Sequence, residues 1–475
     1  NTVLIGRDAG GAINSTGANG TVAIGYQAGY ALTSGNSNVA IGYEAMKVHT
    51  TGASNIAIGY GAMDDTDAGS TSLGSTHNVF IGLDAGGGTW ADAASSYNVG
   101  IGNLVMDSAL DGATYNTAIG YNSLSGITTG DHNTTLGYKA GQNMTTGLYN
   151  VIIGSQAGDA ASIGNYHVLI GSFAGSGINS GDADGTVAIG YNAGAVLKSG
   201  IGSTAIGYEA LKTATENDYN TAVGNRALYS ISGSSGTEGE GNTAVGRYAG
   251  YSTTTGNSNV FIGNAAGYGN TTGIYNNFIG VGAGQNSTTA AQSTYIGWYA
   301  GFYQTVGGNN VAIGHQTLYG TSGKANSAAS NVAIGYQAAM GSEAGAGLVA
   351  VGKGALRNVS DSGSYSTAIG FDSGYYASGS NNTFVGSQAG KGGTTSAPYS
   401  SGTNNTAVGY NALGGFTTGG TNVAVGAYSL DAVTTGTANV GIGYYAGSSI
   451  TDGFQNIVIG ENAGDTMTST RYTVL

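Results

Sequence analysis

The chain has 475 residues with 90 Gly, 1 Pro and no Cys, and its 12 basic side chains stand against 25 acidic ones, a net charge of −13. Gly is far above its usual share of about 7%, yet hydrophobic residues make up 40%, too many for a disordered tail. One Pro excludes collagen, and the absence of Cys excludes disulfide frameworks and thiolate metal sites. The acidic balance argues against nucleic-acid binding. No apolar run reaches the length of a membrane span, so we expect no membrane insertion.

One pentapeptide, Asn-(Val/Thr)-x-(Ile/Val)-Gly, recurs along the chain. Its Gly, called here the marker glycine, gives 26 copies from Gly6 to Gly460, and 15 of the 25 spacings are 17 residues. A period of this kind indicates a repeat architecture rather than a set of separate domains. We therefore expect one repeat domain over 1–475, in which 461–475 forms the remnant of the last coil and a terminal cap or docking segment.

Each copy predicts a short strand that ends at the marker glycine. The residue before the marker is Ile, Val or Leu in every copy, and the residue three places before it is Val, Ile or Thr in all but one. β-Branched residues that alternate with period two are typical of strands. We expect the column before the marker to point to the axis and form the structural core. Its members include Ile5, Ile24, Ile41, Ile58, Ile153, Ile313 and Ile459.

Small residues and turns complete the unit. Ala follows most markers by three residues, and Thr-Thr-Gly tripeptides such as 145–147 end seven residues before the next marker. Seventeen residues suit one coil with two short strands and two turns, and such coils must stack in parallel to bury their apolar side chains. The sequence therefore predicts an all-β fold, a parallel β-solenoid of about 26 coils. The Asn that opens the motif, as at Asn38 and Asn55, is expected to stack into an amide ladder.

The middle residue of the strand, two places before the marker, is large and apolar in nine copies. Alternation would turn it outward if the column before the marker pointed inward. A stripe of large exposed apolar side chains is typical of a partner surface. We therefore expect self-association along the length of the chain through these candidate subunit contacts: Phe80, Phe261, Phe278, Tyr295 and Phe384.

Residues that could carry chemistry are sparse, and we expect no catalytic, cofactor-binding or metal-binding residue. The five His are scattered and expected at the surface, and acidic residues gather only at Asp64–Asp67 and Asp182–Asp184, without the spacing of a calcium loop. Tyr follows the marker in ten copies, among them Tyr26 and Tyr43. This column either covers the aliphatic ridge or offers a ladder on which sugar rings stack.

Four long intervals between markers add residues at one edge of the coil. They are Gly59–Gly82, Gly224–Gly246, Gly314–Gly335 and Gly386–Gly409. Repeat proteins often place a binding surface on the face where insertions gather, although such insertions also arise as tolerated loop variation. Both interpretations of these inserts remain open at this point.

The motif resembles two groups of fibrous proteins. Asn-Val-Ala-Ile-Gly at Asn38–Gly42, Asn310–Gly314 and Asn331–Gly335 is similar to the head repeats of trimeric autotransporter adhesins of the YadA type. Asn-Thr-Ala-Val-Gly-Tyr-Asn-Ala-Leu at Asn405–Leu413 resembles repeats of bacteriophage tail fibres. The resemblance implies a left-handed parallel β-roll, three chains side by side, and a role in attachment to a cell surface or matrix. A glycan or a protein on a host surface is the candidate receptor. The unit is longer than in adhesin heads and no heptad stalk is present, which favours a phage fibre segment or a free-standing fibre.

We therefore expect a non-enzymatic, homotrimeric extracellular fibre, on a virion tail or a cell surface, that provides reach and attachment. One alternative is the structural subunit of a self-assembling extracellular filament, which would grow with concentration. A second is a glycan depolymerase, which would lower the viscosity of its polymer. An ice-binding surface built on the Thr-Thr columns is a third, and thermal hysteresis would reveal it.

Overall fold

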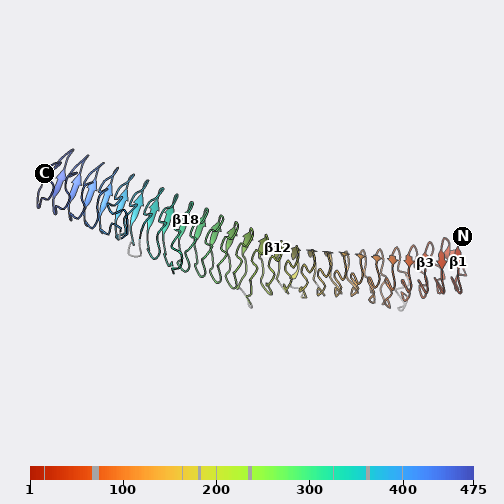
Figure 1. The fold of residues 1–475 in the computed structure, drawn as a ribbon. Coiled ribbons are helices and arrows are strands. Elements are labelled where there is room, and N and C mark those ends of the chain that lie inside the picture. Colours follow the sequence, from red (N-terminus) through yellow and green to blue (C-terminus); the bar gives the residue numbers. More distant parts are fainter. Residues whose placement is uncertain are drawn as a thin grey trace. The chain divides into compact units, whose positions relative to one another are not determined.

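The structure is a computed structural model that describes residues 1–14, 16–66, 74–162, 164–179, 183–198, 200–233, 238–324, 326–359, 364–397 and 399–474. The chain divides into two compact units, Asn1–Gly241 and Asn242–Leu475, called unit 1 and unit 2. In Figure 1 each unit is a succession of similar coils, with one short strand in each coil. No helix in the described ranges has the length and apolar character needed to span a membrane.

The strands are three residues long and end directly before the marker glycine. Unit 1 contains β1 (Val3–Ile5), the 3-10 turn η1 (Thr16–Ala18), β2 (Val22–Ile24), β3 (Val39–Ile41), β4 (Ile56–Ile58), β5 (Val79–Ile81), β6 (Val99–Ile101), β7 (Thr117–Ile119), β8 (Thr134–Leu136), β9 (Val151–Ile153), β10 (Val168–Ile170), β11 (Val187–Ile189), β12 (Thr204–Ile206) and β13 (Thr221–Val223). Unit 2 contains β14 (Thr243–Val245), β15 (Val260–Ile262), β16 (Asn277–Ile279), β17 (Thr294–Ile296), β18 (Val311–Ile313), β19 (Val332–Ile334), β20 (Val349–Val351), β21 (Thr367–Ile369), β22 (Thr383–Val385), β23 (Thr406–Val408), β24 (Val423–Val425), β25 (Val440–Ile442) and β26 (Ile457–Ile459).

Every strand pairs in parallel with the strand of the next coil in its unit. The register places equal repeat positions opposite each other, as in Val22↔Val39, Ala23↔Ala40 and Ile24↔Ile41. The same register runs from β1 to β13 and from β14 to β26. The predicted all-β parallel β-solenoid with a 17-residue repeat is confirmed in each unit, because stacking in register is what a coil of this period requires.

Within the described parts of the coils, turns rather than a second strand complete each coil. The expectation of two strands per coil was wrong, because residues after the marker and before the Asn adopt left-handed backbone conformations that interrupt an extended chain. Examples are Gln27 with φ 51° and Ser37 with φ 57°. The marker Gly42 has φ 141°, and a Cβ there would lie 2.1 Å from the carbonyl oxygen of Gly59 in the next coil. Only Gly fits this position, which explains why the marker recurs in every copy.

The interior of each coil is lined by the middle residue of the strand. Phe80, Phe261, Phe278, Tyr295 and Phe384, predicted as outward subunit contacts, are all 0% exposed. That prediction was wrong. The column before the marker was equally misassigned, because it points away from the axis: Ile5, Ile313 and Ile459 are 57%, 37% and 56% exposed, and the remaining predicted core residues are only half-buried, namely Ile24, Ile41, Ile58 and Ile153.

The physical reason is the small cross-section of the coil. A three-residue strand directs one side chain inward and two outward when its middle residue faces the core. Volume inside the coil is then shared between that middle residue and the residue four places after the marker. The nine copies with a large middle residue all have Gly four places after the marker. The ten copies with Leu or Met four places after the marker have Ala or Gly as the middle residue. A Cβ on Gly284 would lie 2.5 Å from the Phe278 ring, so two large residues do not fit together.

At the end of unit 2 the chain continues the stacking pattern. Val474 forms a parallel bridge with Ile457, and Arg471 forms one with Phe454. The backbone N–H of Thr473 donates to Asn456 Oδ1 at 3.1 Å. This part of the predicted terminal segment therefore lies on the preceding coil, whereas Leu475 lies outside the described residues.

Candidate functional site

The predicted amide ladder is present and buried. Asn133 donates both its backbone N–H and its Nδ2 to Asn116 Oδ1 at 3.0 Å, and Nδ2 also donates to the carbonyl oxygen of Gly147 at 2.7 Å. Asn150 repeats the arrangement with Asn133. Each side chain thus satisfies backbone groups at a corner of its own coil and the next, which makes this column structural and leaves it no free group for a ligand.

The outward residues of the strands form a continuous surface, called here the β-branched face. It consists of the first and third residue of each strand, which are Val, Ile, Thr or Leu in every described strand except at Asn277. Its third-residue column is half-buried or exposed throughout, for example 37% at Ile119 and 42% at Ile369. No charged side chain interrupts the face in either unit. The first-residue row includes Thr in nine strands, whereas the third-residue row is aliphatic throughout. A partly exposed aliphatic row of this continuity is characteristic of a contact surface.

Tyrosine columns border this face. Tyr26, Tyr43 and Tyr60 directly follow their markers and stack with ring centroids 5.0 and 4.9 Å apart. Tyr43 and Tyr60 are 43% and 56% exposed. Because neighbouring rings cover each other's faces, this ladder presents ring edges and hydroxyls to a ligand, rather than the flat face on which a sugar stacks.

A second exposed ladder, not predicted from the sequence, precedes the Asn column in unit 1. Successive centroid distances in it lie between 4.9 and 5.6 Å. A run of aromatic residues directly before the motif Asn in successive copies was the signal that could have revealed it. Its members are His77, Tyr97, Tyr115, His132, Tyr149 and Tyr166.

The histidines divide between surface and interior. The expectation of surface positions was wrong for His49 and His167, which are both buried. His49 is hydrogen-bonded to Thr66 Oγ1 at 2.9 Å and to the Gly52 carbonyl oxygen at 3.1 Å. His167 occupies an Asn-ladder position, and burial lowers its pKa to about 4. Neither of its ring nitrogens has a hydrogen-bond partner.

The predicted acidic clusters lie partly outside the described residues, which omit Asp67 and Asp182. Burial raises the pKa of Asp64 and that of Asp107 to about 6, and the charge of Asp84 adds to both effects. Asp184 accepts hydrogen bonds from the backbone N–H and Nδ2 of Asn165. Throughout the described ranges, no three potential metal ligands among His, Cys, Asp and Glu are grouped to hold an ion.

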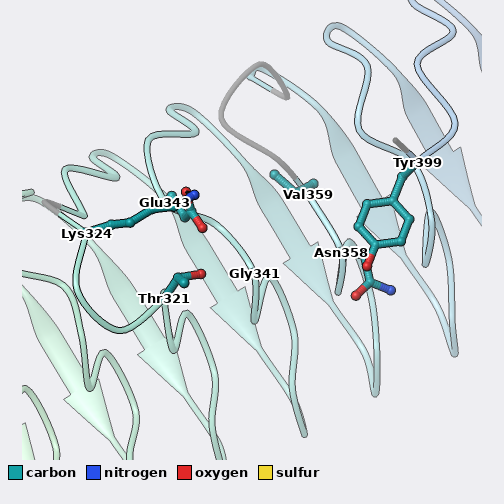
Figure 2. A pocket seen from close by; sticks show the side chains of 7 residues that line it. All are labelled: Thr321, Lys324, Gly341, Glu343, Asn358, Val359 and Tyr399. Atoms are coloured by element: carbon teal, nitrogen blue, oxygen red, sulfur yellow. Dashed lines mark hydrogen bonds and ion pairs between the residues drawn. The ribbon is translucent and has the colours of Figure 1, made fainter. Parts of the chain in front are cut away.

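Unit 2 contains a cavity of about 280 Å³ between its coils. Its wall includes the backbone at Gly341. Figure 2 shows Lys324, Glu343 and Thr321 toward one end, and Asn358 and Tyr399 toward the other. This cavity is called here the insert cavity, because two of the four long intervals supply side chains to it. Its lining side chains are Thr321, Lys324, Glu343, Asn358, Val359 and Tyr399.

Comparison with known proteins adds no family assignment. No protein-family model matches the chain, and no curated protein matches its sequence. The similarity to adhesin-head and tail-fibre repeats therefore stays a prediction that rests on the motif itself.

Proposed function

We propose that this protein is a non-enzymatic extracellular fibre whose chains associate side by side, as a homotrimer, and which serves attachment to a surface. A phage tail fibre is the first assignment and a bacterial adhesin the second. The β-branched face is the observation that carries the proposal. It repeats at every coil and has no charge, and its third-residue column is half-buried or exposed in the single chain. Water-exposed aliphatic columns of this length favour association.

The partner that fits this face best is a second copy of the chain. The rows of the face repeat at the strand spacing of about 4.8 Å, and another copy carries apolar rows with the same spacing. The strand of each coil is three residues long at about 3.3 Å per residue, and neighbouring coils lie about 4.8 Å apart. Each coil therefore contributes about 50 Å² to the face, and the thirteen coils of one unit contribute about 600 Å². A standard interface buries about 800 Å² per partner, so the strand face of one unit supplies about three quarters of this area.

Sedimentation equilibrium of the wild type and of two matched triple variants tests the proposal. Ile279→Lys, Ile296→Lys and Ile313→Lys place charges on the face of unit 2 while every middle residue stays intact. Thr272→Lys, Thr289→Lys and Val306→Lys add the same charges at turns outside the face and serve as the control. We expect trimers for the wild type and the control, and a folded but weaker trimer for the face variant, which dissociates at a higher protein concentration because the face of unit 1 stays intact.

A monomeric wild type, or a face variant that associates as strongly as the control, would contradict the proposal. Open-ended growth with concentration would instead favour the structural filament subunit. Circular dichroism of all three proteins establishes that the coils remain folded. The face variant leaves the interior unchanged, so loss of association without loss of secondary structure assigns the contact to this surface.

A further inference from the structure

The insert cavity exists because two intervals between markers are longer than the repeat. Thr321 and Lys324 belong to Gly314–Gly335, and Tyr399 belongs to Gly386–Gly409. A regular coil closes its turn within seventeen residues and has no additional side chains to line such a space. Inserts that converge on one cavity are expected of a binding surface rather than of unrelated loop variation.

Among the described residues that line the insert cavity, the one positive and the one negative charge balance each other. Lys324 Nζ forms an ion pair with Glu343 Oε2, and the two side chains are 55% and 14% exposed. An anionic ligand would need a positive charge that is not already neutralised. The carboxylate still has lone pairs that accept hydrogen bonds from hydroxyl groups. The cavity is therefore suited to a neutral ligand rich in hydroxyls.

The remaining lining supplies both polar and apolar contacts. Tyr399 is half-buried, and its ring stacks on that of Tyr376 at a centroid distance of 6.1 Å. Asn358 donates from Nδ2 to the Tyr375 carbonyl oxygen at 3.1 Å, which orients its amide at the cavity wall. Val359 contributes a buried apolar side chain. An aromatic ring beside an amide and a carboxylate complements a molecule with C–H faces and hydroxyl edges.

We propose that the insert cavity binds a single neutral pyranose ring and is the ligand site of the fibre. The inference rests on the proposed role in surface attachment and deepens it. A volume of about 280 Å³ lies just below the usual range of ligand pockets, about 300–1,000 Å³, so it suits one ring rather than an extended chain. Tyr399 provides apolar contact, and Glu343 and Asn358 receive or donate hydrogen bonds.

Saturation-transfer NMR with the full chain tests the site. The probes are D-glucose, D-galactose and N-acetyl-D-glucosamine, with N-acetylneuraminic acid as the anionic comparison. We expect saturable, millimolar binding of at least one neutral probe and none of the anionic one. Tyr399→Ala and Glu343→Gln should each weaken that binding by about tenfold, as loss of one good contact does. Tyr365→Ala, at a tyrosine that is 69% exposed and does not line the cavity, is the matched control and should bind as the wild type does.

Three results would overturn the proposal: no saturable binding of any neutral probe, preference for the anionic sugar, or equal affinity of the wild type and Tyr399→Ala. Sedimentation of the same samples separates the two proposals. An intact trimer without sugar binding rejects the cavity as the ligand site and leaves the fibre assignment standing. A monomeric wild type rejects the fibre assignment whatever the sugars do.

Discussion

His167 interrupts the Asn ladder of unit 1 and makes that coil sensitive to acid. Its backbone N–H donates to Asn150 Oδ1 at 2.8 Å, as an Asn in this column does. Its imidazole, however, is fully buried without a hydrogen-bond partner on either nitrogen. An Asn at this position would restore the two Nδ2 bonds seen at Asn133. We therefore expect His167→Asn to stabilise the coil by about 1–2 kcal/mol at pH 8.

The acid effect follows from the pKa of the imidazole. Burial lowers it from 6.5 to about 4 in the folded protein, and the charge of Asp184 opposes this only in part. A His whose folded pKa is depressed contributes its full stability above pH 6.5 and loses it as the pH falls toward 4, because the unfolded chain binds the proton first. The loss at pH 5 is about 2 kcal/mol, and the complete loss is about 3.4 kcal/mol.

Hydrogen exchange measured by mass spectrometry on peptides covering 151–171 is the assay, with wild type and variant compared at the same pH so that intrinsic exchange rates cancel. The protection gained by His167→Asn should increase about thirtyfold between pH 8 and pH 5, the equivalent of about 2 kcal/mol. His132→Asn, at an exposed imidazole in the ring ladder, is the control and should give no such increase. Equal pH dependence in wild type and His167→Asn would refute the reasoning.

Two further predictions concern packing and charge. Phe278→Ala should destabilise unit 2 by about 3–5 kcal/mol, and Gly284→Leu alone should also destabilise it by overpacking. The double variant should recover most of the lost stability, because other coils combine Ala with Leu at these two positions. Urea unfolding of the three variants measures this, and additive losses in the double variant would contradict shared volume. Asp64 has a raised pKa of about 6, so its contribution to stability is full below pH 3.8 and lost as the pH rises through 6. Asp64→Asn should therefore be more stable than wild type by about 1–2 kcal/mol at pH 7 after discounting for solvent screening. Thermal unfolding between pH 4 and pH 7 measures this, and a variant whose stability changes with pH as that of the wild type does would exclude this explanation.

The insert cavity illustrates what a repeat pattern cannot predict. Interval lengths located the inserts at Gly314–Gly335 and Gly386–Gly409, and they indicated one edge of the coil. Which inserts converge depends on how the coils between them stack. Asn358 and Glu343 lie in those intervening coils and line the same space. Contacts between residues this far apart in sequence arise from packing alone.

The period, the strand before each marker glycine and the Asn ladder were all predictable from residue types, because stacking in register repeats each position at a constant place. Which strand residues point inward was not predicted correctly. Alternation with period two lets either the middle residue or the two residues beside it face the interior, and apolar residues occur at all three places. Packing settles the choice: the narrow coil accommodates Phe278 opposite Gly284, and alternation along the strand then places Ile279 outside. The pairing of large middle residues with glycine was present in the sequence, but its meaning depends on the two positions meeting across the coil interior.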